Sequence, residues 1–190
     1  MNNVKGIAGD SVQAAVIRPT AEFEQVHAGG VFHILCYDKD GNLKWEEKGP
    51  NLVVNTGLQY MVSTSLDAAA QTTVWYLGLI NTLTSIVGGD TMASHAGWVE
   101  DTNYSQATRP TATFGTATTA NPSVIDNSAS VAVFSINATT TINGAFLTSS
   151  NTKGGTTGTL FSAKAFTGGA RSVISGDTLN VTYTFSLTGT

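Results

Sequence analysis

Charged side chains are scarce in this chain of 190 residues. Asp, Glu, Lys and Arg make up 12% of it, about half of the roughly 25% that is usual in globular domains. The formal net charge is -4 and the few Lys and Arg residues are scattered, which argues against the basic surface that nucleic-acid binding requires. An apolar fraction of 41% is too high for a disordered chain. We therefore expect a folded protein with no nucleic-acid partner.

Cysteine and long hydrophobic runs are equally scarce. Cys36 is the only cysteine, so a disulfide within the chain is excluded, and its apolar neighbours predict a small buried thiol. No apolar run approaches the roughly 18 residues of a membrane-spanning helix, and residues 1–5 do not lead into a signal-peptide core. We expect no membrane partner, and a protein that is made and used without secretory export.

Alternation is what the chain has in abundance, and the clearest example is its last strand, residues 179–188. Apolar and polar side chains alternate there without an error, which is the pattern of a half-buried β-strand. The polar side carries no charge and consists of Asn180, Thr182, Thr184, Ser186 and Thr188. This strand is expected in a sheet whose hydroxyl-rich face suits a close-packed neighbour, because burying a hydroxyl costs less than burying a charge.

Further short strands follow without the alternating helices of a βαβ fold. The Asp-Gly turn at residues 38–42 predicts a hairpin between strands 31–37 and 43–47. The continuous apolar run of residues 74–80 predicts a central strand buried on both faces. The other predicted strands are residues 51–54, 111–116, 131–136, 140–148 and 159–166. Together they predict an all-β protein, an antiparallel β-sandwich or jelly roll.

One short helix is expected after residue 54. Asn55 and Thr56 have the side chains of N-terminal caps for a helix over residues 57–66. Leu58, Met61, Val62 and Ser65 lie on one face of that helix, and we expect the helix to plug an end of the sandwich. A single helical turn is also expected within residues 90–97, with Asp90 as its cap.

The first 30 residues differ from the rest of the chain. They show no sustained hydrophobic period, and they are too few to close a core of their own. We therefore expect an extended N-terminal arm over residues 1–30 and one β-sandwich or jelly-roll domain over residues 31–190.

Residues with the chemistry for metal binding occur singly. Asp38, Asp40 and Asn42 have part of the spacing of a calcium loop, but Gly41 falls between the second and third candidate ligands and no Glu closes the loop. The tip of a hairpin is the better interpretation. The histidines have no partner at a metal-ligand spacing. We expect no metal and no cofactor.

His95 is the one residue around which a hydrolytic site can be imagined, because Ser94 and several acids lie near it in the sequence. Ser94 would face a different direction on a helical turn, and the chain has no Gly-x-Ser-x-Gly elbow. The acidic residues, with Glu47 and Asp101 among them, are interpreted as surface charges, and Tyr104 as the most exposed ring. We expect no catalytic residue and no enzyme.

Six segments taken together resemble a family of small structural proteins of tailed bacteriophages, capsid decoration or cement proteins among them. The segments are NLVVNTGL (51–58), WYLGLI (75–80), DTMASHAGW (90–98), YSQATRP (104–110), GAFL (144–147) and GDTLNVTY (176–183). The resemblance runs from about residue 31 to residue 190, and the combination is more specific than any one segment. The arm before residue 31 is longer than is typical of that family.

The resemblance implies a virion protein on the capsid exterior, assembled in the host cytoplasm. Its partner would be the major capsid protein, and a dimer or trimer is expected at the symmetry axes of the shell. Cement proteins of this kind bind across the joints between capsid subunits and stabilise the head. The resemblance brings no catalytic residues with it.

Partner contacts are expected from two parts of the chain, the arm and the Thr-rich strand face. The residues are Val12, Val16, Ile17 and Phe23 in the arm, and Thr182 and Thr184 in the last strand. A tail or neck adaptor, or a fibre protein, is an alternative within the virion. A carbohydrate-binding or hydrolytic β-sandwich is an alternative from another class.

Overall fold

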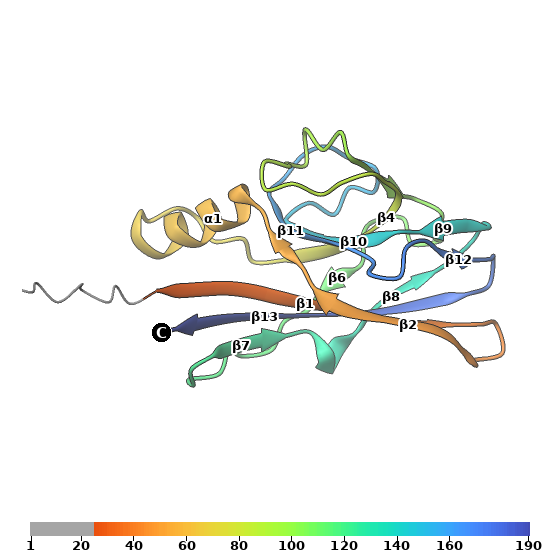
Figure 1. Ribbon diagram of the computed structural model, residues 1–190, viewed down its shortest axis with the longest axis horizontal. Coiled ribbons are helices and arrows are strands. Elements are labelled where there is room, and N and C mark those ends of the chain that lie inside the picture. The colour runs from red at the N-terminus through yellow and green to blue at the C-terminus, as the bar shows by residue number, and fades with distance from the viewer. Residues whose placement is uncertain (1–24) are drawn as a thin grey trace, which may run out of the picture.

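The computed structural model describes residues 25–190, which form an antiparallel β-sandwich with one α-helix at one end (Figure 1). The predicted all-β class is confirmed, with a sandwich of two sheets. Strand begins at Val26, so five residues assigned to the arm belong to the first strand of the sandwich. The arm residues Val12, Val16, Ile17 and Phe23 lie outside the described part of the chain.

The first sheet is built around two long strands that pair along their whole length. Val26 lies opposite Gly189 and Tyr37 opposite Thr178. Its strands are β1 (Val26–Tyr37), β2 (Leu43–Pro50), β7 (Ser123–Asp126), β8 (Ala132–Ser135) and β13 (Thr178–Gly189). The order is β2-β1-β13-β7, and β8 pairs with β13 beyond the end of β7. The chain's last strand therefore lies in the interior of the sheet, as its alternation predicts.

The second sheet is made of shorter strands. They are β3 (Leu52–Val53), β4 (Trp75–Leu83), β5 (Trp98–Asp101), β6 (Thr111–Ala112), β10 (Gly144–Thr148) and β11 (Leu160–Ala165). The order is β3-β11-β10-β4-β5, with β6 also paired to β4. A small ribbon of β9 (Thr140–Ile142) and β12 (Arg171–Val173) stands beside it, and one 3-10 turn spans Ser128–Ser130. The run at residues 74–80 is a central strand, as expected.

The core lies between the inner faces of the two sheets. Phe32, Ile34 and Cys36 of β1 and Leu179 and Val181 of β13 are fully buried, as their alternation requires. Burial raises the pKa of the Cys36 thiol to about 12, so the thiol is inert, in keeping with the sequence interpretation.

Residues 140–148 form two strands in place of the single strand expected. Asn143 separates β9 from β10: its backbone N–H donates to the carbonyl of Ile80, and its carbonyl accepts from the N–H of Phe166. Gly144 has no room for a Cβ against the backbone of Lys164. The chain therefore changes direction at Asn143, which alternation alone does not reveal.

Helix α1 (Asn55–Leu66) begins two residues earlier than expected and has no side-chain cap. The N–H of Asn55 donates to the carbonyl of Gly88, and the Thr56 hydroxyl donates to the carbonyl of Leu160. The Asn55 backbone and the Thr56 hydroxyl thus attach the start of α1 to a neighbouring loop and to β11. The expected capping by these two residues is wrong, because both lie inside the first turn and Val54 occupies the N-cap position.

The segment before β5 has no helical turn. Thr91 and Ser94 form an isolated bridge, and Asp90 is buried rather than placed at a helix start. Its carboxylate accepts hydrogen bonds from the Trp98 indole (3.0 Å) and the Val87 N–H (3.1 Å). The expected helical turn is therefore wrong, because Asp90 holds a buried tryptophan.

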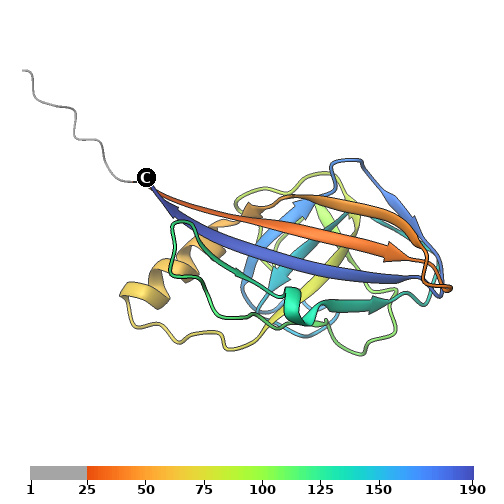
Figure 2. The same ribbon diagram turned by 90° about the horizontal axis from the view of Figure 1, so that it is seen from below.

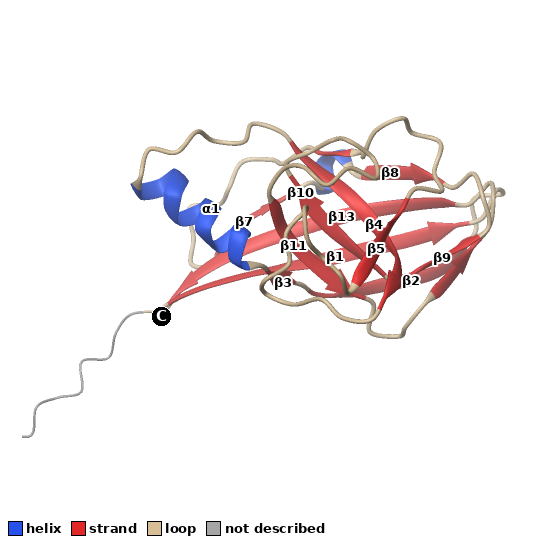
Figure 3. Ribbon diagram, turned by 90° about the horizontal axis from the view of Figure 1, so that it is seen from above, coloured by secondary structure: helices blue, strands red, loops and turns tan. Residues whose placement is uncertain are grey.

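The two sheets differ in length, and this shapes one end of the molecule. β1 and β13 have twelve residues each, or about 40 Å of strand, whereas β10 has five, or about 17 Å. The first sheet extends beyond the second at the end where β1 begins and β13 finishes. Helix α1 lies over that extension in two perpendicular views (Figures 1 and 3).

Candidate functional site

The outer face of the first sheet is a regular strand surface, and no other element of residues 25–190 covers the β1–β13 pair from outside (Figure 2). Thr182 and Thr184, predicted as partner contacts, lie on this face, opposite His33 and Val31 of β1. Both threonines are partly exposed. The sequence expectation that the hydroxyl side of the last strand points outward is therefore confirmed.

Charge is confined to the margins of this outer face. Glu46 and Lys48 lie on the edge strand β2, and Asp126 lies on β7. His27 and His33 of β1 also lie on this face, and the Nε2 of His33 is 2.7 Å from the Glu46 carboxylate. The centre of the face consists otherwise of hydroxyl, amide and aliphatic side chains, which lose little on dehydration compared with ions.

A second uncharged surface is an apolar cleft between α1 and the extension of the first sheet. Its volume is about 370 Å³. The lining residues are Val26, Ala28, Leu58, Met61, Val62, Ser65, Leu66 and Leu187, which we call the α1 cleft. None of them is charged. The cleft therefore suits an apolar, uncharged occupant.

Exposure in the α1 cleft is unusually high for side chains of this type. Val26 is 72% exposed, Val62 60% and Leu66 85%. Helix α1 lies at one end of the sandwich, as expected (Figure 1), and Tyr60 and Met61 pack against the core there. The Tyr60 ring is 5.1 Å from that of Trp75, whereas Leu58 and Val62 remain exposed.

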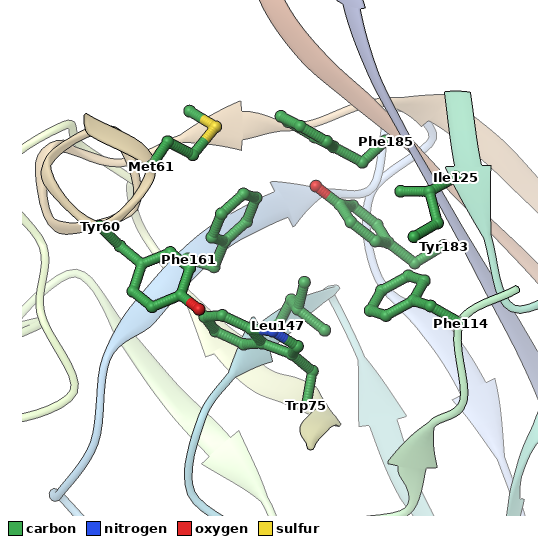
Figure 4. A pocket seen from close by; sticks show the side chains of 9 residues that line it. All are labelled: Tyr60, Met61, Trp75, Phe114, Ile125, Leu147, Phe161, Tyr183 and Phe185. Atoms are coloured by element: carbon green, nitrogen blue, oxygen red, sulfur yellow. The ribbon is translucent and has the colours of Figure 1, made fainter. Parts of the chain in front are cut away.

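An aromatic pocket of about 200 Å³ lies deeper, between the two sheets and under α1 (Figure 4). Its walls are Tyr60, Met61, Trp75, Phe114, Ile125, Leu147, Phe161, Tyr183 and Phe185. The rings meet edge to face, as do Phe161 and Phe185 at 5.2 Å. Met61 lines both the pocket and the α1 cleft, so the two apolar spaces adjoin at this residue.

Two buried ionic clusters tie the sandwich together. Lys164 of β11 is 3.0 Å from the Glu47 carboxylate of β2, which Arg171 also approaches at 3.4 Å. Arg109 donates two hydrogen bonds to Glu100, of 2.8 and 2.7 Å. Glu47 is buried, so its interpretation as a surface charge is wrong.

The carboxyl of Glu47 is held ionised by its partners. Burial by itself raises the pKa, but hydrogen bonds from the Thr167 N–H and from Lys164, together with the charge of Lys164, outweigh burial and hold the pKa below its ordinary value of 4.5. Glu47 thus joins the first sheet to the second through Lys164. This is a structural role in the fold.

The other residues singled out in the sequence have structural surroundings. His95 stacks on Trp98 at 3.7 Å, and its Nδ1 lies 2.9 Å from the Trp98 carbonyl. Asp101 is buried and accepts hydrogen bonds from Asn81 and Asn103, so it is not a surface charge. Tyr104 is fully buried, and burial raises its pKa; the expectation of an exposed ring is wrong.

The tip of the first hairpin is closed by its own hydrogen bonds. Asp38 Oδ1 accepts from the backbone N–H groups of Asp40 and Asn42, each at 2.9 Å. Hydrogen bonds from Asn42, from its side chain first and then its backbone, hold the pKa of Asp38 below its usual range. The arrangement is that of an Asx turn. Within residues 25–190 no three His, Cys, Asp or Glu side chains are grouped as metal ligands would be.

Helices long and apolar enough to cross a membrane are not found in the described part of the chain.

The sequence interpretation missed the α1 cleft, although a signal for it was present. Leu58, Val62 and Leu66 recur every four residues, and Tyr60 adds a second apolar direction. A helix with two apolar directions requires two apolar neighbours.

Comparison with known proteins adds no relative. No family model matches the chain, and searches of curated proteins and of solved structures find no match to it.

Proposed function

We propose that the protein is a structural component of a tailed-phage virion, and specifically a capsid cement protein that binds the major capsid protein across subunit joints. Two observations support this proposal. Six segments of the sequence resemble small phage structural proteins, and the fold presents a broad outer sheet face whose charges are confined to its margins, of the kind that packs against a neighbour. The second observation carries the argument.

The dimensions of the outer face approach those of a protein interface. Strands β1 and β13 have twelve residues each, β2 has eight, and β7 and β8 have four each. At about 3.3 Å per residue and about 4.8 Å between strands, the face measures about 630 Å², somewhat less than the roughly 800 Å² that each partner buries in a specific complex. One face of one sheet therefore supplies most of the area of a specific contact.

The chemistry of the face suits a permanent, crowded neighbour. Thr182 and Thr184 bring methyl groups and hydroxyls but no charge, so dehydration is inexpensive and salt has little influence. Many such contacts around a shell act together through avidity, even if each one is weak. A symmetric dimer or trimer at the capsid axes would present several such contacts at once, and we therefore include a homo-oligomer in the proposal.

The location in the particle is tested by the copy number in purified virions. A cement protein is present in many copies per particle, in a fixed ratio to the major capsid protein. Quantitative mass spectrometry of virions, with cryo-electron microscopy of the shell, measures both number and position. A few copies confined to the tail vertex would contradict the proposal and support the adaptor or fibre alternative.

The contact surface is tested by charge insertion. Thr182→Arg with Thr184→Arg places two cations in the centre of the outer face, and Thr141→Arg on the exposed side of β9 is the matched control. We expect the double variant to bind shells at least about tenfold more weakly, because a stranded interfacial charge costs more than about 1.4 kcal/mol. The control should bind as the unmodified protein does.

The carbohydrate-binding alternative gains no support from the ring on which it depended. Tyr104 is fully buried, with its ring 5.0 Å from that of Phe134. A glycan array on the intact protein tests this alternative independently of the shell-binding experiment.

A further inference from the structure

We propose that the α1 cleft is a docking site for the protein's own N-terminal segment, and that residues 12–17 of the same chain cover it. The proposal is independent of where the protein acts. It rests on the chemistry of the cleft, on the point at which the described chain begins, and on the composition and length of the segment before that point.

The cleft is an unfinished part of the hydrophobic core. Val26, Ala28 and Leu187 belong to the inner faces of β1 and β13, in the same alternation that buries Phe32 and Val181 further along. Over these three residues the second sheet is missing, and α1 is the only cover within residues 25–190. A further apolar layer is what the inner face lacks.

The segment starts at the cleft itself. Val26 lines the cleft, and the described chain begins one residue earlier, at Gln25. The peptide groups of Gln25 and Thr190 exchange both backbone hydrogen bonds, of 3.0 and 2.9 Å. The first 24 residues are therefore tethered beside the cleft by an ordered strand end.

The composition of the segment complements the cleft. Residues 11–17 read SVQAAVI and contain no charge, between Asp10 and Arg18. Val12, Val16 and Ile17 supply branched apolar side chains, and the intervening alanines permit close approach. Because no charged residue lines the cleft, an uncharged apolar stretch can enter it without burying an unpaired ion.

The connection is long enough, and it favours the same chain over a second copy. Ile17 lies nine positions before Val26, a span of about 30 Å when extended, whereas α1 is about 18 Å long. A turn back onto the cleft therefore fits within the linker. A tether of this kind gives a local concentration in the millimolar range, far above the concentration of other copies in a dilute solution.

Disulfide trapping in the intact chain tests the proposal. Cys36 is fully buried and its pKa is raised by burial, so new surface cysteines react without interference. The test variant carries Ile17→Cys and Val62→Cys. The control carries Ile17→Cys and Val99→Cys. Val99 is 58% exposed, close to the 60% of Val62, but it lies on β5 of the second sheet and does not line the α1 cleft.

Mild oxidation at micromolar protein should join residues 17 and 62 within one chain. The expected result is a monomer that has lost both added thiols and two mass units, at a rate independent of protein concentration, with both thiols retained in the control. A disulfide-linked dimer would overturn the proposal in favour of a second copy. Retained thiols in the test variant, or equal trapping in the control, would overturn it as well.

A second pair guards against a local effect of the Val62 substitution. Ile17→Cys with Leu66→Cys places the thiol one turn further along α1, at a side chain that is 85% exposed and tolerant of change. Circular dichroism of each reduced variant establishes that the fold is intact before oxidation. Trapping is expected in this pair too, and its failure would contradict the proposal even if the Val62 pair were perturbed.

Discussion

The two halves of the long β1–β13 pair have the same alternating sequence pattern and opposite surroundings. In one half, Phe32, Ile34, Leu179 and Val181 are fully buried against the second sheet. In the other half, Leu187 and Val26 continue the same inner face, yet they border a cleft. The difference between the halves is the presence of an opposing sheet. Alternation therefore specifies which side chains can be core, and the neighbouring layer decides which of them are.

The packed half also contains the buried ion pair that joins the two sheets. Lys164 crosses from β11 to Glu47 on β2, and Glu47 is paired in register with the buried Ile34. At the extended half, α1 is attached instead through the Thr56 hydroxyl and through backbone hydrogen bonds. We expect the packed half to unfold last and the α1 end to open first.

The largest effect is expected from Lys164→Met. This substitution removes the cation between the sheets and leaves buried Glu47 with the more distant Arg171, so unfolding should become easier by about 3 kcal/mol or more. Urea denaturation measures the change. The double variant Lys164→Met with Glu47→Met should recover part of the loss, because it leaves no unpaired charge. A double variant less stable than the single one would contradict the inter-sheet ion pair.

Leu179→Ala in the packed half should cost about 2–5 kcal/mol, because it opens a cavity where no side chain can collapse into the space. Leu179 is fully buried between the two sheets. The urea concentration at the midpoint of unfolding measures the loss, provided that the dependence of the free energy of unfolding on urea is unchanged. A loss below about 1 kcal/mol would show that this half is less tightly packed than the burial of Leu179 indicates.

Leu187→Ala in the extended half is the matched case, with the same residue type on the same strand and the same face. Leu187 is 38% exposed, so about 1 kcal/mol is expected. The ratio of the Leu179 and Leu187 effects measures the contrast between the halves directly. Equal losses would mean that the cleft is as well packed as the core.

Acid should weaken the packed half through Glu47. Its pKa is lower in the folded protein than the ordinary 4.5, so its contribution to stability is complete above that value and is lost as pH falls through the folded pKa. Glu47→Gln should therefore flatten the decline of stability below pH 4.5, in urea titrations at a series of pH values. Asp67→Asn, at the exposed end of α1, controls for loss of one negative charge.

The smallest effect is expected on the outer face. Thr184→Ala removes a partly exposed hydroxyl from β13 and should change the free energy of unfolding by no more than about 0.5 kcal/mol. Thermal unfolding of the isolated protein is sufficient to measure it. A loss well above 1 kcal/mol would assign Thr184 to the fold instead of leaving it available to a partner.

Local patterns predicted much of this fold. The Asp-Gly hairpin, the central strand at β4 and the alternating β13 were all found where composition and period indicated them. Strands β5, β7 and β12 were missed, because segments of three or four residues show no reliable period. The equally short β3, β6 and β8 were found only inside longer predicted segments. Helix α1 was found at an end of the sandwich, but the sequence does not say which of its apolar side chains meet the core, because they point in two directions.

The candidate surfaces divide in the same way. Thr182 and Thr184 were expected on an outward face, because strict alternation with buried neighbours leaves them no other side. Glu47 and Asp101 were taken for surface charges, although Lys164 and Asn103 accommodate them in the interior. Lys164 is 117 residues from Glu47 in the chain, whereas Asn103 is two residues from Asp101. Only the second pairing can be inferred from the local sequence.

By itself, the sequence determined the fold class, the strands with long alternation and the uncharged hydroxyl side of β13, because these follow from composition and from the two-residue period of a strand. Tertiary structure alone decided that the first sheet extends past the second, that α1 stands over this extension, and that Glu47 is buried. The physical reason is that burial depends on what lies opposite a side chain, and the opposite layer is built from residues distant in the chain.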